Sequence, residues 1–282
     1  MPVVPPPGQQ QGGSQAGAPR QAASFGDVSV RVGDDLVAIA EIRRPPDNFF
    51  DSALIASLAD GYAWLDEQAG ARAIVLCSRG KHFCAGADFA GRSPRAQPLT
   101  SDDGPREIYA QATRLFRARL PVVAAVQGAA VGGGLGLACS ADFRVASPHT
   151  RFCANFTRLG LHHGFGLSVT LPESIGRQRA IDMLYTGRRV SGEEAARFGL
   201  ADRLAEEADL RSAAHELAAQ IASAGPLAVR SVRATMRAGL ADRVAAAMDA
   251  ELAEQRLLWP TADFAEGVRA SAERRAPRFE GR

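Results

Sequence analysis

Cysteine is scarce in this sequence, and the few cysteines are scattered. Cys77, Cys84, Cys139 and Cys153 form no C-x-x-C pair. The ligand spacing of structural zinc sites and the dense cysteines of disulfide-stapled domains are therefore both missing. We expect reduced thiols, no metal site and a cytoplasmic location.

Long apolar runs and an excess of one charge are also missing. No run approaches the roughly 18 to 20 apolar residues that span a bilayer, and the N-terminus lacks the layout of a secretory signal. Lys and Arg number 33 against 31 Asp and Glu, which gives no reason to expect a nucleic acid or a membrane as partner. The 46% hydrophobic content supplies a sizeable core.

The first 25 residues differ in composition from the rest of the chain. They are rich in Pro, Gly and Gln, and Arg20 is their one charged residue. Such a segment cannot bury enough apolar surface to offset the entropy of ordering. We therefore predict a disordered tail over residues 1–25.

Hydrophobic periodicity predicts strands and helices in alternation through the first half of the chain. Helices dominate from about Leu171, where Ser191 and Glu194 have the layout of a capping box. A polar stretch from Gly91 to Gly104 predicts a mobile loop. Periodicity alone does not decide whether the sheet is parallel, so it leaves a doubly wound nucleotide-binding fold open. The predicted strands are 28–32, 36–42, 73–76, 121–126, 143–146 and 151–154, and the predicted helices of the first half begin after Asp51 and span 108–116.

Two segments place small residues directly after a predicted strand: residues 81–88, KHFCAGAD, and residues 126–138, VQGAAVGGGLGLA. Without side chains the backbone can approach a ligand closely, and a helix that begins at Gly133 or Gly134 leaves unpaired amides that favour an anionic oxygen. Alone, Gly132 to Gly134 is typical of a tight turn. Neither a Walker loop nor a dinucleotide-binding G-x-G-x-x-G is matched.

Together, these two segments at this spacing resemble the crotonase (enoyl-CoA hydratase/isomerase) family. The resemblance covers about residues 27–282 and includes the segments RPPDNFFD at 44–51, ADFRVA at 141–146, LGL at 159–161, TGRRVS at 186–191 and EG at 266–267. It implies an α/β fold, a crotonase-like spiral of β-β-α turns over residues 26–218 that carries the acyl-CoA site. It also implies a C-terminal helical region over residues 219–282, which assembles homotrimers or dimers of trimers.

The resemblance further implies a substrate site for acyl-CoA, with no cofactor beyond the coenzyme A moiety of the substrate. It assigns the backbone amides of Ala87 and Gly133 to an oxyanion hole for the thioester carbonyl, in agreement with the small-residue pattern. The implied substrate-binding residues are Arg44, Lys81, Ala85 and Asp88 near the nucleotide, Phe279 or Arg278 from the C-terminal region, and Gly134, Gly136, Phe156 and Gly164 along the pocket.

Hydratases of this family use two glutamates to activate water. By the resemblance, Gly136 and Phe156 occupy the two corresponding positions in this sequence. Neither residue can carry a proton. Some isomerases of the family have their acid at a position that looks like Gly164 here, and glycine cannot carry a proton either. His162 and His163 are the nearest ionisable candidates for a proton carrier, although both can also be structural. Asn155 is a candidate for orienting a water, and Phe156 for walling an apolar acyl pocket.

Three residue types near these segments are expected to have other roles. Asp142 is expected to cap a turn or pair with Arg144, and Glu173 to face solvent. Cys84 and Cys139 are expected to be inert buried thiols.

Three functions remain open at this point. The first is an enoyl-CoA hydratase/isomerase-like enzyme with an unusual proton carrier. The second keeps the oxyanion hole but performs isomerisation, decarboxylation or hydrolysis of a thioester. The third is a non-catalytic acyl-CoA-binding protein, which the missing carboxylates favour and the retained oxyanion loops disfavour.

Overall fold

A computed structural model describes residues 21–67, 70–89 and 104–282 of the chain. Its larger sheet has seven strands, and the predicted hairpin of β2 and β3 is confirmed, since these strands pair antiparallel. From β3 onward neighbouring strands are parallel. In spatial order the strands are β1 (Gln21–Phe25), β2 (Val28–Val32), β3 (Val37–Ile42), β4 (Ala73–Ser78), β5 (Val122–Val126), β7 (Phe143–Ala146) and β10 (Arg203–Leu204).

A smaller sheet lies beside the first and carries part of the glycine-rich segment. It consists of β6 (Ala129–Val131), β8 (Arg151–Cys153) and β9 (Arg189–Ser191). β6 pairs with β8 in parallel, and β8 pairs with β9 antiparallel. The chain thus passes repeatedly from a strand of the large sheet to a strand of the small sheet and then into a helix. This arrangement confirms the α/β class of β-β-α turns.

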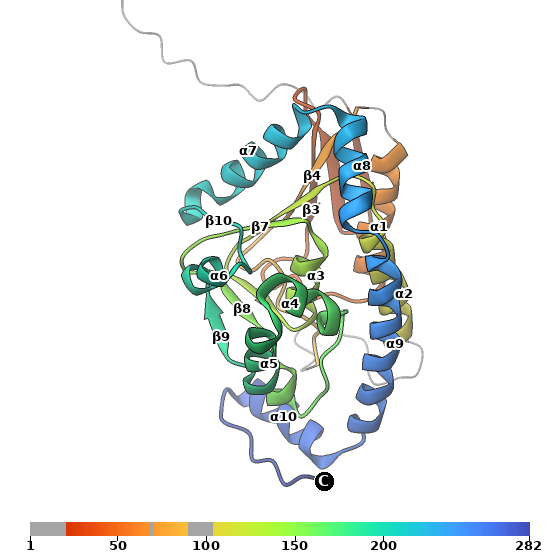
Figure 1. The fold of residues 1–282 in the computed structure, drawn as a ribbon. Coiled ribbons are helices and arrows are strands. Elements are labelled where there is room, and N and C mark those ends of the chain that lie inside the picture. The colour runs from red at the N-terminus through yellow and green to blue at the C-terminus, as the bar shows by residue number, and fades with distance from the viewer. Residues whose placement is uncertain (1–20, 68–69, 90–103) are drawn as a thin grey trace, which may run out of the picture.

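Ten helices are described, and Figure 1 shows α7 across one side of the large sheet and α9 alongside α2. They are α1 (Ser52–Glu67), α2 (Gly104–Phe116), α3 (Gly133–Ser140), α4 (Leu167–Ile175), α5 (Arg177–Thr186), α6 (Gly192–Phe198), α7 (Leu210–Ala222), α8 (Pro226–Met236), α9 (Leu240–Leu258) and α10 (Ala262–Glu273). Short 3₁₀ turns span Asn155–Leu159 and Glu207–Asp209.

The large sheet is buried on both faces, which explains why β4 is apolar without alternation. Ile74 and Leu76 belong to the main core, together with α1, α2 and α3. Val75 and Cys77 point to the opposite face and join a second cluster with α7. Because successive side chains of a strand alternate between faces, a strand covered on both sides reads as a continuous apolar run.

The structure corrects the predicted tail at its C-terminal end. Residues 21–25, placed in the tail, form β1, which pairs antiparallel with β2. Phe25 lies 6.4 Å from Trp64 of α1, measured between ring centroids. Pairing with β2 and partial burial of the Phe25 ring offset the poor composition of this segment. Residues 1–20 and most of the predicted loop 91–104 lie outside the described residues.

Two further predictions in the second half are corrected. The segment predicted as helical contains the short strands β9 and β10, which are only three and two residues long. The Ser191 hydroxyl does accept a hydrogen bond from the Glu194 amide at 3.2 Å. The carboxylate of Glu194, however, binds Arg188 at 2.8 and 3.0 Å instead of completing the capping box.

Candidate functional site

The two small-residue segments lie against each other, joined backbone to backbone. The Cys84 amide donates to the Ala129 carbonyl at 3.1 Å, and the Val131 amide donates to the Cys84 carbonyl at 3.0 Å. Gly86 has a φ of +88°, and a Cβ there would lie 2.7 Å from the Val131 carbonyl oxygen and 4.0 Å from the Gly133 nitrogen. Glycine is therefore required at Gly86, both for backbone conformation and for space.

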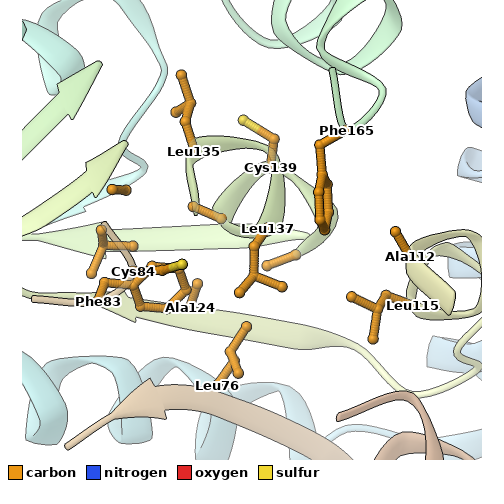
Figure 2. Packing of buried hydrophobic residues seen from close by; sticks show 14 of the residues in the cluster. Leu76, Phe83, Cys84, Ala112, Leu115, Ala124, Leu135, Leu137, Cys139 and Phe165 are labelled. Atoms are coloured by element: carbon orange, nitrogen blue, oxygen red, sulfur yellow. The ribbon is translucent and has the colours of Figure 1, made fainter. Parts of the chain in front are cut away.

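The glycine-rich helix α3 is buried along its whole length. A Cβ at Gly134 would overlap the Cys84 carbonyl, and a Cβ at Gly136 would lie 2.6 Å from the Cβ of Phe165. Figure 2 shows the Phe165 ring beside α3 and Leu137, a residue of α3, among the buried core residues. The small residues let α3 pack directly on the Cys84 loop, and Gly136 makes room for Phe165.

Asn48 fixes the first of these segments to the loop after β3, a role that the sequence analysis did not assign. Its side chain is fully buried, and its Nδ2 donates to the carbonyls of Arg79 at 2.8 Å and His82 at 2.6 Å. Its Oδ1 accepts from the Arg44 amide at 2.9 Å. Only an amide side chain offers both donors and an acceptor in this arrangement.

A cavity of about 630 Å³, counting the space open to solvent at its mouth, lies where α3, α2 and α9 meet. Its wall is mainly apolar and aromatic, as in many small-molecule sites. It brings together Ala85, Ala87, Gly133, Phe156 and Gly164 of the predicted site residues. The other described residues that line it are Phe50, Gly86, Phe89, Pro105, Ile108, Tyr109, Val131, Gly132, Asn155, Leu159, Phe165, Gln255 and Trp259.

Ala87 and Gly133 both line the cavity, and the backbone amide of neither donates a hydrogen bond to any of the described residues. Gly133 is the first residue of α3, so its N–H is one of the donors that a helix start leaves unpaired. Ala87 forms an isolated bridge with Phe50, whose amide donates to the Gly86 carbonyl at 3.1 Å. Two free N–H groups at one apolar cavity can bind an anionic oxygen.

Of the described residues, three with polar side chains line the same cavity: Tyr109, Asn155 and Gln255. The Tyr109 hydroxyl donates to Gln255 Oε1 at 3.0 Å, and Gln255 Nε2 donates to the His162 carbonyl at 3.1 Å. Burial raises the pKa of Tyr109, and the nearby Glu251 carboxylate raises it further. Asn155 was a sequence candidate, whereas Tyr109 and Gln255 were not. Gln255 and Trp259 also show that the cavity extends beyond the predicted core of residues 26–218.

His162 and His163 stack on each other with ring centroids 4.1 Å apart, and neither is among the residues that line the cavity. His162 Nδ1 lies 2.8 Å from the His163 carbonyl, and His163 Nε2 lies 2.8 Å from the Ser168 hydroxyl. Burial and the neighbouring His162 lower the pKa of His163 to about 4. At neutral pH His163 is therefore uncharged.

The residues expected to contact coenzyme A are not gathered in the cavity, apart from Ala85. Arg44 is engaged inside the chain, since its guanidinium binds Asp27 at 2.6 Å and Asp51 at 2.7 Å. Asp88 is buried and Lys81 is exposed, both close in sequence to Ala85. Phe279 is 42% exposed beyond α10.

Of the expected pocket residues, Phe156 and Gly164 line the cavity, whereas Gly134 and Gly136 do not. Gly134 and Gly136 instead serve the packing of α3, because any side chain there would collide with Cys84 or Phe165. Gly164 faces Tyr109, so closely that a Cβ at Gly164 would overlap the tyrosine hydroxyl.

Asp142 has partners other than the predicted Arg144. Its carboxylate accepts from the Val122 amide at 2.8 Å and binds Arg233 and Arg237 of the α8 region at 2.9 Å each. Arg144 pairs with Asp202 instead. Asp142 therefore ties the sheet to α8 and is not a free acid.

The remaining reactive groups near the glycine-rich segments fit the expected structural roles. Cys84 and Cys139 are free and buried, and burial raises the pKa of both thiols, that of Cys84 to about 12. Glu173 is 45% exposed and pairs with Arg243.

Two other features are missing from the part of the chain that the structure describes. No described helix is both long and apolar enough to cross a bilayer. Within the described ranges, His, Cys, Asp and Glu side chains form no group of three or more that could hold a metal ion.

Comparison with known proteins gives consistent matches over most of the chain. The family described as enoyl-CoA hydratase/isomerase matches residues 34–282. A Rhodobacter capsulatus protein named "Probable enoyl-CoA hydratase" is 37% identical over 213 residues, which cover 75% of this chain and 82% of that protein. The Mycobacterium bovis protein named "Probable enoyl-CoA hydratase echA12" is 38% identical, with 80% and 82% covered. The crystal structure of an enoyl-CoA hydratase/isomerase from Pseudoalteromonas atlantica superposes with a TM-score of 0.78 at 29% identity, covering 90% of this chain and all of that one.

Proposed function

Since the chain belongs to the enoyl-CoA hydratase/isomerase family, we propose that it binds acyl-coenzyme A thioesters in the cavity and stabilises an enolate oxyanion. The thioester carbonyl accepts hydrogen bonds from the amides of Ala87 and Gly133. The observation that carries this proposal is the presence of these two unpaired N–H groups in one apolar cavity wall. The acyl group lies among Phe50, Phe156 and Phe165, which favour an apolar chain or ring.

In this mechanism the two amides stabilise the charge that develops on oxygen while a carbon next to the carbonyl gains or loses a proton. They are fixed by the backbone before the substrate arrives, so they need no reorganisation during the reaction. Loss of one such donor typically slows turnover by about 10²- to 10³-fold. The same hole serves hydration, isomerisation, decarboxylation or hydrolysis of a thioester, because each passes through an oxyanion.

The experiment that tests this function is steady-state turnover of short, medium and aromatic 2-enoyl-CoA and 3-enoyl-CoA thioesters, with binding of each measured on the same preparation. We expect turnover of at least one class, and the products distinguish hydration from isomerisation. Failure to bind every thioester would refute the proposal. Binding of thioesters without any turnover would favour the second candidate, a non-catalytic acyl-CoA-binding protein. That candidate draws support from the described cavity wall, which contains no carboxylate.

The oxyanion hole itself is tested with acetoacetyl-CoA, whose enolate has a distinct near-ultraviolet absorption. We expect the protein to lower the apparent pKa of this ligand, because the amides of Ala87 and Gly133 favour the enolate. Gly133→Val should abolish the effect, since a Cβ at this position would overlap the Phe50 ring. Gly225→Ala is the matched control: Gly225 has a φ of −60°, and a Cβ there would meet only the Cβ of Ala228, at 3.9 Å.

We further propose that the protein acts in the cytoplasm as a homotrimer or a dimer of trimers. The exposed apolar side chains of α8, Leu227, Val232 and Met236, support self-association. Light scattering after gel filtration measures the subunit number. A monomer at micromolar concentration would refute this part.

A further inference from the structure

The described part of the cavity wall contains a single ionisable side chain, that of Tyr109. Among the described residues, no Asp, Glu, His, Cys, Lys or Arg lines it. Asn155 and Gln255 can hydrogen bond, but an amide does not act as an acid or a base near neutral pH. Among the described lining residues, Tyr109 is therefore the one side chain that can exchange a proton with the acyl group.

Gly164 makes room for this hydroxyl. A Cβ at Gly164 would overlap Tyr109 Oη and would lie 2.7 Å from Gln255 Nε2. Gly164 is not among the glycines with a positive φ, so its backbone conformation does not require glycine. The missing side chain at Gly164 is thus explained by the tyrosine, which reaches from α2 into the space that residue 164 would otherwise fill.

Gln255 holds the hydroxyl in place. The hydroxyl donates to Gln255 Oε1 at 3.0 Å. Gln255 is itself oriented, because its Nε2 donates to the His162 carbonyl at 3.1 Å. A fixed hydroxyl in an apolar cavity can act on a substrate without the entropy cost of ordering a flexible side chain. Burial raises the pKa of Tyr109, so the group stays protonated and is suited to donate a proton rather than to remove one.

On the premise of the proposed function, we propose that Tyr109 donates the proton that a carbon of the acyl group receives. The electron pair of the enolate double bond forms the new C–H bond, and the oxygen held by Ala87 and Gly133 becomes a carbonyl again. The Tyr109 O–H leaves its hydrogen bond to Gln255 Oε1 and breaks, and its electron pair stays on the phenolate oxygen. A proton from water then restores the phenol. A phenol is a stronger acid than a carbon next to a thioester carbonyl, so this transfer is downhill.

The test compares Tyr109→Phe with Tyr62→Phe, assayed on whichever thioester the unmodified chain turns over. Tyr62 is the matched control because it is also buried, lies in α1 outside the cavity lining and has a hydroxyl with no hydrogen-bond partner in the described structure. We expect Tyr109→Phe to lower kcat by about 100-fold or more, the usual range for a general acid, with thioester binding within about threefold of the unmodified chain. In D₂O, deuterium incorporation at the substrate carbon should fall in parallel. Tyr62→Phe should leave both rates unchanged.

Turnover by Tyr109→Phe within about threefold of the unmodified chain would overturn the role of Tyr109 while leaving the proposed function intact. The pH profile of the unmodified chain gives a second test that needs no variant. A phenol with a raised pKa predicts a kcat that stays level from about pH 6 to pH 9. A histidine that donates this proton has to be protonated, so it gives an alkaline limb, with kcat falling as the pH rises through the ordinary histidine pKa of about 6.5. Such a limb would overturn the inference, and lack of turnover on the whole panel would overturn it together with the proposed catalytic function.

Discussion

Glu251 of α9 accepts a hydrogen bond from the Gly166 amide at 2.8 Å, across 85 residues of sequence. Its other oxygen accepts from the Ser168 amide at 2.9 Å and from the Ser168 hydroxyl at 2.6 Å. Gly166 is the N-cap residue of α4, so a carboxylate from another helix satisfies the amides that this helix start leaves unpaired. The contact also holds the segment with Gly164 and Phe165 against α9.

Replacing Glu251 should therefore destabilise the fold and loosen the Gly164–Phe165 segment of the cavity wall. Glu251→Ala leaves the amides of Gly166 and Ser168 without their partner, and we expect the free energy of unfolding to fall by about 2–4 kcal/mol. Urea denaturation measures the change. Glu254→Ala, an exposed position on the same helix, should change it by less than about 0.5 kcal/mol. An equal loss in the two variants would contradict the capping role.

The close approach of Gly164 and Tyr109 predicts a coupling that a double-mutant cycle can measure. Gly164→Ala alone should cost about 1–3 kcal/mol of unfolding free energy, because its Cβ overlaps the Tyr109 hydroxyl. In the Tyr109→Phe background the hydroxyl is gone, and the nearest atom of the residue 109 ring is Cζ, at 3.0 Å from the new Cβ. Gly164→Ala should then cost at least about 1 kcal/mol less unfolding free energy than it does alone. Strictly additive effects would contradict the contact.

The sequence placed two small-residue segments directly after strands, and the structure joins these segments beside one cavity. Strand ends and glycine spacing are local features, so the segments could be identified before the fold was known. The assignment of Ala87 and Gly133 to an oxyanion hole came from the family resemblance and stays a prediction. Tyr109 and Gln255 could not be identified in advance, since they lie 146 residues apart and meet only when α2 packs beside α9. Neither helix carries a local motif that distinguishes these side chains from ordinary buried ones.

Neither the family resemblance nor the local sequence specifies the partners of individual side chains. The guanidinium of Arg44, a residue predicted to lie near coenzyme A, is balanced by Asp27 and Asp51. Asp142 was expected to cap a turn or pair with Arg144, but it binds two arginines near α8. Such pairings depend on long side chains that reach across elements, and sequence spacing carries no information about that reach.

His163 predicts a loss of stability on acidification. Its pKa is about 4 in the folded chain against an ordinary value of 6.5, because the ring is buried beside His162. The unfolded chain therefore binds more protons between these values, and the stability that His163 contributes above pH 6.5 is lost as the pH falls toward 4. The slope is about 1.4 kcal/mol per pH unit at most. In His163→Gln the denaturation midpoint should vary less with pH across this window than in the unmodified chain. An unchanged slope of midpoint against pH would contradict the lowered pKa of His163.

Phe156 predicts the size of the acyl group that the cavity accepts. Its ring lies in the cavity wall, and the side chain is only 7% exposed. Phe156→Ala removes that part of the wall, so kcat/KM for medium-chain or aromatic thioesters should rise relative to the shortest substrate by about tenfold or more, as for other changes of pocket size. The ratio of the two kcat/KM values is the measurement, because a general loss of stability lowers both alike. Phe198→Ala removes a half-buried ring outside the cavity lining and should leave this ratio unchanged. If Phe156→Ala also leaves it unchanged, the acyl group does not contact Phe156, and the apolar wall formed by Phe50 and Phe165 sets the chain length instead.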